Sequence, residues 1–326
     1  MCIDFVVTWV DGSDPEWIAK KNKYQGNDEP TEVVTKRYRD WGIFKYWFRA
    51  VEKYAPWVNN IYVITDNQRP DFLDINHPKI KLVYHDEFIP KEYLPTFSSH
   101  VIENNMHRIN GLSEYFVYFN DDMFLNRPVK PTDFFRRGKS CYEMIERPCE
   151  PHLPMEAHNY AQINNMAIIN RHFSRKTKIS KFINFRYGLS GIKNIFMLPW
   201  RKYSHFQDNH MPVPYLKSTI EEVWSSEQEF FDKISRNKFR THEDANHFVF
   251  RYWDLARGKF SPYKFKDGYY SINKSTVHGC ANDILRGDSM MICVNDGGDN
   301  DNFENNRITI VNAFLSKFRH KSEYEK

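Results

Sequence analysis

Two adjacent carboxylates, Asp121 and Asp122, follow the strongly apolar run at residues 115–119. Five consecutive residues that favour β-structure predict a buried strand. Open α/β sheets bind ligands at the carboxyl ends of their strands, which is where these two side chains are expected. Paired carboxylates there can hold a hard divalent cation on a diphosphate, or one of them can act as a base. The alternative interpretation of Asn120-Asp121-Asp122 is a polar turn after a core strand.

A second candidate site is the loop after the first predicted strand, which contains Asp11, Gly12, Ser13 and Asp14. A flexible backbone, a hydroxyl and two carboxylates can approach a pyrophosphate or a ribose. The loop matches neither the Walker A motif nor the GxGxxG pattern of dinucleotide-binding proteins. A plain turn is therefore the alternative to a nucleotide site.

Further titratable groups gather at three places along the chain. Glu103 and His107 are four residues apart in a predicted helix and would share one face, with Arg108 beside them. Such a pair can do acid–base work or orient a metal-bound group, and an ordinary surface ion pair is the alternative. His210 and Arg240 lie in two later polar segments, and a guanidinium is well shaped to bind phosphate oxygens.

The elements that must position these residues alternate between strands and helices in the first half of the chain. Because that alternation is typical of parallel sheets, we predict an α/β fold, with a mostly parallel Rossmann-like sheet flanked by helices and a helical basic insertion in the second half. A polar loop is expected at residues 18–36, and Asp40 is a candidate N-cap. The predicted strands are 3–10, 59–65, 81–85, 115–119, 166–169 and 290–294, and the predicted helices are 43–51, 98–109, 217–236, 242–255 and 308–318.

The sequence of 326 residues contains no linker, so we predict a single catalytic α/β domain over residues 1–326. Residues 1–127 would form the nucleotide-binding half. Residues 128–208 would form a basic, aromatic-rich insertion, and residues 209–326 would complete the site and add a C-terminal helix. The glycine-rich stretch after Asp296 does not fit a calcium-binding EF-hand and is expected to be a strand-end loop that donates one carboxylate.

Charge is distributed unevenly along this chain. The net charge of +4 is too small to indicate nucleic acid as a partner. Residues 157–207 contain no carboxylate, and their nine lysines and arginines are interleaved with aromatic residues. Such a segment suits an anionic membrane surface or a phosphate-bearing acceptor. A solvated cationic face over ordinary core residues is the alternative.

The start of the sequence predicts no export signal, and no apolar run approaches the length of a membrane span. The five cysteines are an odd number without the spacing of a metal site. We therefore expect reduced thiols and a cytoplasmic location, with peripheral contact at the inner face of the membrane.

Residues 4–15, with the sequence DFVVTWVDGSDP, resemble the first sequence block of the Stealth family of sugar-1-phosphate transferases. Residues 38–124, which begin with YRDW and end with NDDMF, resemble its second block. Residues 210–244 resemble the third block and residues 293–296 the fourth. The four blocks occur in the family's order, and residues 128–208 lie outside them.

The Stealth family includes bacterial capsular and cell-wall polysaccharide phosphotransferases and the catalytic subunit of the lysosomal-enzyme GlcNAc-1-phosphotransferase. The resemblance implies that an acceptor hydroxyl attacks the β-phosphorus of a UDP-sugar. Hexose 1-phosphate, expected to be an N-acetylhexosamine 1-phosphate, would pass to an oligosaccharide or lipid-linked glycan acceptor, and UMP would leave. This chain lacks the large inserted modules of the lysosomal enzyme, so the compact bacterial form is the better match.

The resemblance also implies roles for individual residues. The family's catalytic positions correspond to Glu103, Asp122, His210 and Arg240. Asp122, together with Asp296, would hold Mg²⁺ or Mn²⁺ on the diphosphate. Arg240 would stabilise the β-phosphate oxygens, and His210 is the leading candidate for the base, although the base and metal roles of His210 and Asp122 can be exchanged. The expected substrate-binding residues are Asp11, Gly12, Ser13, Asp14, Arg39, His107, Arg108 and Asn120.

The fourth block departs from the family pattern, because it reads Asn295-Asp296-Gly297-Gly298 where Asn-Asp-Asn is expected. Two other functions remain open from the sequence. A metal-dependent glycosyltransferase would use the same fold and aspartates but would release UDP. A carbohydrate- or lipid-binding module would bind glycan without turnover.

Overall fold

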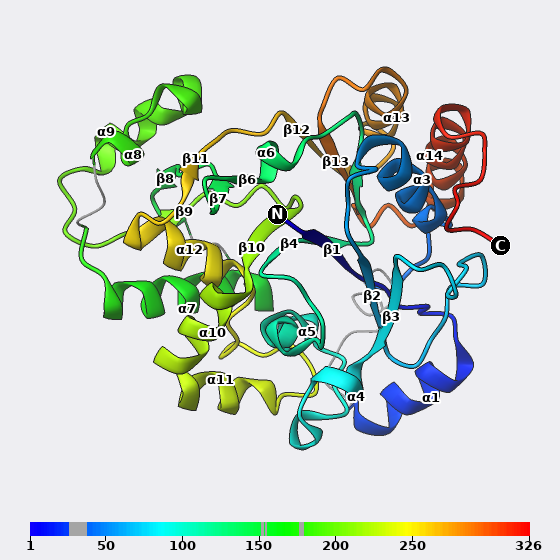
Figure 1. The fold of residues 1–326 in the computed structure, drawn as a ribbon, viewed down its shortest axis with the longest axis horizontal. Coiled ribbons are helices and arrows are strands. Elements are labelled where there is room, and N and C mark those ends of the chain that lie inside the picture. Colours follow the sequence, from blue (N-terminus) through cyan, green and yellow to red (C-terminus); the bar gives the residue numbers. More distant parts are fainter. Residues whose placement is uncertain (26–37, 151–152, 154, 176–178) are drawn as a thin grey trace.

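A five-stranded sheet forms the centre of the protein (Figure 1). The computed structural model describes residues 1–25, 38–150, 153, 155–175 and 179–326. The spatial order is β10-β4-β1-β2-β3, in which β10 is antiparallel to β4 and all the other pairs are parallel. These strands are β1 (Ile3–Thr8), β2 (Ile61–Thr65), β3 (Ile80–Tyr84), β4 (Tyr115–Asn120) and β10 (Val213–Leu216). The predicted α/β fold with a mostly parallel sheet is thereby confirmed.

The order of the strands reverses between β1 and β4. From β1 the chain first adds β2 and β3 on one side and then returns to place β4 on the other side. Thr8, at the end of β1, pairs with Asn120, at the end of β4. In open α/β sheets this kind of reversal leaves a crevice at the carboxyl ends of the two strands.

Both faces of the sheet are covered, which explains why its strands are apolar throughout. Side chains that alternate along a strand point to opposite faces, so Phe5 and Val7 join one buried cluster and Val6 joins the other. The first cluster includes α3 (Phe44–Tyr54), α13 (Val277–Arg286) and α14 (Phe303–Lys317). The second includes α5 (Ser99–Asn105), α7 (Ala157–His172), α10 (Lys217–Ser226), α11 (Gln228–Ser235) and α12 (Phe248–Arg257).

A smaller sheet stands beside the main one (Figure 1). It consists of β12 (Asp267–Ile272), β13 (Met291–Asp296) and β5 (Met123–Leu125). β13 is parallel to β12 and antiparallel to β5, with Cys293 opposite Met123. Because β5 follows β4 after only two residues, the carboxyl end of β13 lies next to that of β4.

The rest of the described chain consists of short elements. The helices are α1 (Pro15–Tyr24), α4 (His85–Phe88), α6 (Pro131–Phe134), α8 (Ile179–Phe182) and α9 (Ile192–Met197), and the strands are β6 (Phe135–Arg136), β7 (Lys139–Tyr142), β8 (Glu146–Arg147), β9 (His205–Phe206) and β11 (Ser261–Pro262). None of the helices in the described ranges is both long enough and apolar enough to cross a bilayer.

Two predictions about the second half of the chain are wrong. Residues 166–169 are part of α7 and not a strand, because the buried residues Ala161, Asn165, Ile168 and Ile169 recur at helical spacing over a longer window. The helix predicted from residue 242 begins at Phe248. The preceding residues form a turn in which side chains compete for backbone hydrogen bonds.

Two predictions about the first half also need correction. Part of the loop expected at residues 18–36 is helical, because Asp14 caps α1 by accepting from the backbone N–H groups of Glu16 and Trp17. The rest of that predicted loop, from residue 26, lies outside the described residues. Asp40 does not cap α3; its carboxylate accepts from the N–H of Gly42 in the preceding turn.

Candidate active site

A cleft of about 600 Å³ lies at the carboxyl edge of the main sheet, where the smaller sheet adjoins it. A cleft of this size suits a small-molecule substrate or cofactor. The strand ends, α5 and two loops of the second half of the chain contribute to it. The polar side chains that line it include Arg39, Asp66, Ser99, Glu103, Asn120, Asp121, Asp122, His210, Arg240 and Asp296.

Asp121 and Asp122 form the turn between β4 and β5. The backbone carbonyl of Asp122 accepts from the N–H of Val294 at 2.8 Å, which fixes this turn against β13. Burial, reinforced by the charge of Asp122, raises the pKa of Asp121 to about 7. Two carboxylates held together in this way favour binding of a proton or a cation.

Asp122, His210 and Cys293 form a compact cluster in the cleft. Asp122 Oδ2 lies 3.5 Å from His210 Nε2 and accepts from Cys293 Sγ at 3.3 Å. Burial disfavours the charge on both Asp122 and His210, but their mutual attraction outweighs it. The pKa of Asp122 is therefore lowered and the pKa of His210 is raised.

His210 occupies an unusual backbone conformation, with a φ of +44°. Residues other than glycine rarely adopt this left-handed region, although histidine is one of those that visit it more often. Backbone strain of this kind persists where the surrounding structure holds a residue in place, and it is frequent at functional sites. The turn therefore orients the imidazole toward Asp122 at some conformational cost.

Glu103 is a buried acid in the wall of the cleft, with 4% of its surface exposed. Tyr118 donates a hydrogen bond to Glu103 Oε1 at 3.3 Å, and the hydroxyl of Ser99 also bonds to this carboxylate. Burial raises the pKa of Glu103 to about 6, although the charge of Arg240 opposes the shift. Glu103 is thus poised to change its protonation state near neutral pH.

Arg240 reaches the cleft from a loop between α11 and α12, and its guanidinium donates to Ser99 Oγ at 2.6 Å. Ser99 consequently links Arg240 to Glu103. The loop is held where Phe97 N–H donates to the carbonyl of Lys238 at 2.7 Å.

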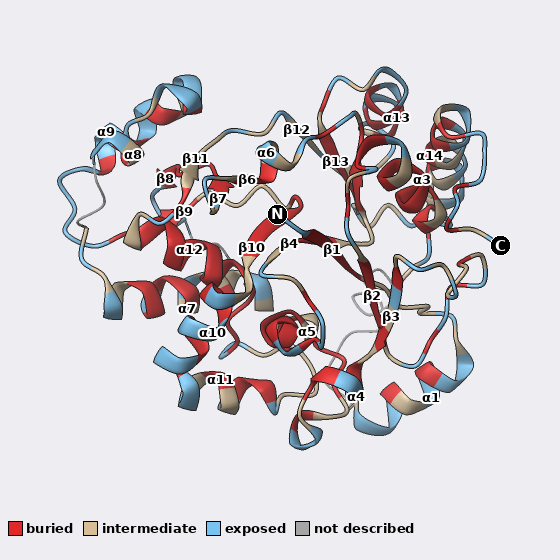
Figure 2. Ribbon diagram, viewed as in Figure 1, coloured by how far each residue is buried: buried red, intermediate tan, exposed pale blue. Residues whose placement is uncertain are grey.

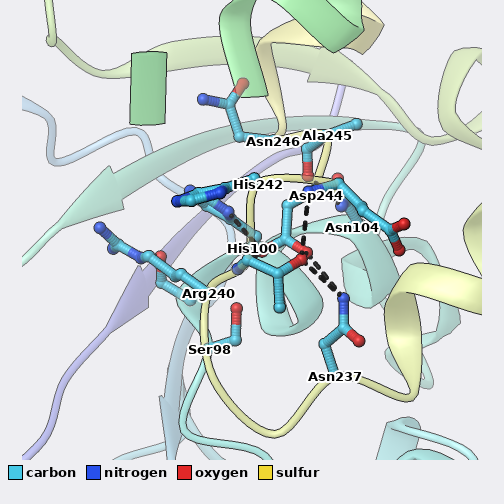
Figure 3. A network of polar contacts seen from close by, with 12 residues as sticks. Ser98, His100, Asn104, Asn237, Arg240, His242, Asp244, Ala245 and Asn246 are labelled. Atoms are coloured by element: carbon cyan, nitrogen blue, oxygen red, sulfur yellow. Dashed lines mark hydrogen bonds and ion pairs between the residues drawn. The ribbon is translucent and has the colours of Figure 1, made fainter. Parts of the chain in front are cut away.

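Asp244 organises the turn that follows Arg240, as Figure 3 shows. Its carboxylate lies 3.0 Å from His100 Nδ1 and accepts from Asn237 Nδ2 at 2.9 Å. It also accepts from the N–H and the hydroxyl of Thr241. Because Asp244 is only 1% exposed, these bonds are shielded from water and fix the path of the Arg240 loop.

Arg39 and Asp296 form a bidentate ion pair across the mouth of the cleft. Both contacts of the guanidinium with the carboxylate are 2.8 Å long. Arg39 also donates to Asn300 and stacks on the ring of Phe303 at 4.0 Å. Asp296 accepts in addition from the N–H of Gly298, whose φ is +76°. The carboxylate predicted to bind the metal is thus paired with Arg39, and the pair connects Arg39 to the glycine-rich loop.

The loop that contains Asp11, Gly12, Ser13 and Asp14 does not line the cleft in the described structure. Asp11 accepts from the N–H and the hydroxyl of Ser13, and Asp14 caps α1 and binds Gln68. Gly12 is needed for close packing, since a Cβ at this position would lie 2.2 Å from the carbonyl oxygen of Tyr38. These four residues shape the wall behind Tyr38, which itself lines the cleft.

His107 and Arg108 lie outside the cleft as well. The helix α5 ends at Asn105 and continues as a 3₁₀ turn, which directs the two side chains away from Glu103. They line a separate pocket of about 340 Å³. There the imidazole of His107 packs at a tilt against Trp224, with 5.4 Å between the ring centroids, and the guanidinium of Arg108 lies over the same ring at 4.6 Å. The structure therefore does not bring the predicted Glu103–His107 pair together.

Two residues of the site had no predicted role: Ser99 and Cys293. Ser99 had a signal in the sequence, because it precedes Glu103 by one helical turn. Cys293 had none, since its approach to Asp122 depends on the register between β13 and β5.

The acidic residues at the end of β4 fit Mg²⁺ or Mn²⁺. Asp122 Oδ1 is buried and has no hydrogen-bond partner, and Asp121, the preceding residue, lines the same cleft. Both side chains offer the oxygen ligands that hard cations prefer. Burial and the charge of Asp122 raise the pKa of Cys293 well above its usual range, so a neutral thiol adds little affinity for these ions.

Comparisons with known proteins place the chain among polysaccharide phosphotransferases. Family models described as Stealth protein conserved region 1 and conserved region 2 match residues 1–29 and 37–142. The resemblance of residues 4–15 and 38–124 to the first two blocks is thereby confirmed.

Similar proteins extend the likeness over the whole chain. The capsular polysaccharide phosphotransferase WcwK of Streptococcus pneumoniae is 42% identical over 99% of both chains. The exopolysaccharide phosphotransferase cps2G of Lactiplantibacillus plantarum is 40% identical over 99% of this chain and 96% of its own length. A solved structure of mouse xyloside xylosyltransferase 1 covers 90% of this chain and 98% of its own at 11% identity, with a TM-score of 0.39, which is too low to support an argument.

Proposed function

The chain belongs to the Stealth family, and from that membership and the geometry of the cleft we propose that it transfers hexose 1-phosphate from a UDP-sugar to a glycan hydroxyl. The reaction would serve capsular or exopolysaccharide synthesis, as the names of its relatives indicate. A P–O bond forms between the acceptor oxygen and the β-phosphorus, and the bond from that phosphorus to the bridging oxygen breaks. The products are a phosphodiester and UMP.

The observation that carries this proposal is that the two carboxylate oxygens of Asp122 have different surroundings. Its Oδ2 faces His210 and Cys293, whereas its buried Oδ1 has no partner. One carboxylate can thus orient a base and also bind a cation. Mg²⁺ or Mn²⁺ held by Asp121 and Asp122 would neutralise charge on the diphosphate.

His210 is the base in this proposal. Asp122 raises the pKa of the imidazole, which strengthens its attraction for the acceptor proton, and the surrounding structure holds His210 in its strained backbone conformation. The guanidinium of Arg240 would bind the oxygens of the transferred phosphoryl group, where negative charge is concentrated. Glu103 holds Arg240 through Ser99 and supplies the opposite charge.

Peripheral contact between the basic segment at residues 157–207 and an anionic membrane belongs to the same proposal. It would bring the enzyme to an acceptor that is linked to lipid. Carboxylate-free segments are attracted to such surfaces by about 1 kcal/mol for each nearby lysine or arginine.

The identity of the released nucleotide tests the proposal. The protein would be incubated with a panel of UDP-hexoses, Mn²⁺ and a glycan extract, and the nucleotide products would be separated by chromatography. We expect UMP, which should disappear in Asp122→Ala and persist in Asp71→Ala, since Asp71 is exposed and lies outside the cleft. Release of UDP would instead identify a glycosyltransferase, and UMP release unaffected by Asp122→Ala would remove the assigned role of that residue.

A further inference from the structure

The described residues between Arg175 and Arg201 form an excursion from the body of the protein. The N–H of Arg175 donates to the carbonyl of Arg201 at 3.2 Å, so the two ends of the excursion meet. From residue 179 onward the described chain between them forms α8, a 3₁₀ turn (Phe185–Gly191) and α9. Figure 1 shows α8 and α9 at the rim of the molecule, far from the main sheet.

The outer side of this excursion is unusually apolar. Half of the large apolar side chains that are exposed in the described part of the chain lie at residues 179–200. The most exposed are Phe185 at 87%, Leu189 at 85% and Phe196 at 71%, and Trp200 is more than half exposed. Figure 2 shows the ribbon of α8 and α9 mostly in the colour of exposed residues. A clustered apolar surface of this kind marks a site of interaction.

The exposure has a structural cause, because the inner side of the excursion is firmly packed. Phe182, Tyr187 and Met197 are buried. Asn194 donates to the carbonyl of Met144 at 2.7 Å and accepts from the N–H of Glu146 at 2.8 Å. The apolar side chains on the outer face are therefore held outward by contacts on the inner face.

The charges around this surface have a single sign. Arg186, Lys193 and Arg201 are exposed, and within the described residues no carboxylate forms an ion pair with them. The sequence between residues 157 and 207 contains no carboxylate at all. The surface therefore combines exposed aromatic and aliphatic groups with unneutralised positive charge, which is the pattern of elements that lie in the interface of an anionic bilayer.

We propose that residues 179–201, here called the docking hairpin, insert Phe185, Leu189, Phe196 and Trp200 into the surface of an anionic lipid bilayer. Arg186, Lys193 and Arg201 contact lipid phosphates at the same time. This goes beyond electrostatic attraction of the basic segment, because apolar groups enter the membrane and fix the orientation of the protein.

A second copy of the chain fits this surface less well. In a two-fold symmetric dimer the same patch faces itself, so Arg186, Lys193 and Arg201 would meet their own counterparts. Like charges brought together in this way oppose association. The charge of the docking hairpin thus favours lipid over self-association.

The docking hairpin is also connected to the cleft. Glu156, which lines the cleft, directly precedes α7, and α7 ends three residues before Arg175. A helix of sixteen residues is about 24 Å long. A single helix therefore lies between Glu156 in the cleft and Arg175 at the base of the docking hairpin.

Sedimentation with lipid vesicles tests the proposal. The protein would be mixed with vesicles of phosphatidylcholine alone, or with about one third phosphatidylglycerol, at low and high salt. We expect binding to the anionic vesicles only, and weaker binding at high salt. The double variant Phe185→Gln/Phe196→Gln should lower the partition coefficient at least about tenfold, since each buried aromatic side chain contributes strongly to membrane affinity.

Two matched controls separate the docking hairpin from the rest of the surface. Ile308→Gln/Leu315→Gln removes two exposed apolar groups from α14, and Lys91→Gln/Lys274→Gln/Arg319→Gln removes three exposed charges elsewhere. Both should bind vesicles much as the unmodified protein does, apart from a small general effect of charge. By contrast, Arg186→Gln/Lys193→Gln/Arg201→Gln should lower anionic binding about 100-fold.

Three outcomes would overturn the proposal: no vesicle binding, equal binding of the aromatic double variant, or a dimer of the unmodified protein that the same variant converts to a monomer in sedimentation equilibrium. UMP release with a water-soluble acceptor should be unchanged in the variants of the docking hairpin. The two assays also separate the two proposals. UMP release can be absent while the protein still binds vesicles, and vesicle binding can be absent while UMP is still released.

Discussion

Glu103 is ionisable but buried, and this gives it opposite effects on activity and on stability. Burial raises its pKa in the folded protein to about 6, from an ordinary value of 4.5. The folded state therefore binds a proton more tightly than the unfolded state, and the free energy of unfolding falls as the pH rises from about 4.5 through about 6. Above that range the protein bears the cost of a buried carboxylate.

We expect Glu103→Gln to stabilise the protein at pH 7 by roughly 2 kcal/mol, because it removes that cost. The same substitution should abolish most turnover, since the charge opposite Arg240 is lost. Urea unfolding at pH 4.5 and pH 7, together with the rate of UMP release, measures both effects. A variant that is less stable than the parent at pH 7 would contradict the assigned pKa of Glu103.

Arg240→Lys tests whether the planar guanidinium is used in the reaction. A lysine keeps the charge but cannot bind two phosphate oxygens in a fork and cannot hold Ser99 in the same position. We expect kcat to fall about 100-fold with little change in KM for the donor. Arg236→Lys is the matched control, because Arg236 is exposed and pairs with Asp232 away from the cleft. Near-normal turnover of Arg240→Lys would remove Arg240 from the transition state.

The turn between α11 and α12 owes its shape to one buried carboxylate. Asp244 binds His100, Asn237 and Thr241, and the same turn carries Arg240. Substitution by asparagine replaces one acceptor oxygen by a donor and leaves some of these partners unsatisfied. The turn should then hold the Arg240 side chain less firmly in the cleft.

We therefore expect Asp244→Asn to lower kcat about tenfold to 100-fold and to leave KM for the donor nearly unchanged. If Asp244 acts by positioning Arg240, adding Arg240→Lys to Asp244→Asn should cost far less than the sum of the two single losses. Kinetics of the four proteins in this cycle provide the measurement. Fully additive losses would show that Asp244 acts independently of Arg240.

The glycine-rich loop after β13 presents a choice between two roles for Asp296. If its carboxylate serves as the anchor for Arg39, then Arg39→Gln and Asp296→Asn should raise KM for the donor by similar factors, and the double variant should be no worse. If instead Asp296 binds the cation, only Asp296→Asn should shift the Mn²⁺ concentration needed for activity. Titrations of both single variants with Mn²⁺ distinguish the two roles, and the geometry leads us to expect the first.

The cleft joins parts of the molecule that belong to different buried clusters. Glu103 extends from α5, which packs in one cluster, and Asp296 ends β13, which packs in the other. A ligand that contacts both sides should therefore stabilise the protein as a whole. Binding to the folded state alone contributes about 2.7 kcal/mol at a ligand concentration one hundred times Kd.

We expect UDP with Mn²⁺ to raise the Tm by a few degrees, and EDTA to remove the increase. In Asp122→Ala the part of the Tm increase that depends on Mn²⁺ should be lost, whereas Asp71→Ala should show the full increase. Differential scanning calorimetry gives the shift. An equal increase in the absence of any divalent ion would contradict the role of Asp121 and Asp122 as cation ligands.

Local sequence determined most of the elements and several members of the site. The apolar run before Asn120 predicted β4, and the polar residues at its end fell at the edge of the sheet where the cleft lies. Predictions from short segments failed where the pattern over a longer window decided the structure. At residues 166–169 a run of apolar residues predicted a strand, but the helical spacing of the buried residues places them in α7. The predicted division at residues 127 and 208 stays a prediction.

What only the tertiary structure decided is which of these residues meet. Arg39 and Asp296 are 257 residues apart and Asp122 and Cys293 are 171 apart, so their contacts depend on how two sheets pack and on the register of β13 against β5. His107 was separated from Glu103 by the change from α-helix to 3₁₀ turn at Met106. Sequence encodes the preferences of neighbouring residues directly, whereas contacts between distant segments arise from the packing of the whole chain, and the cleft is built from such contacts.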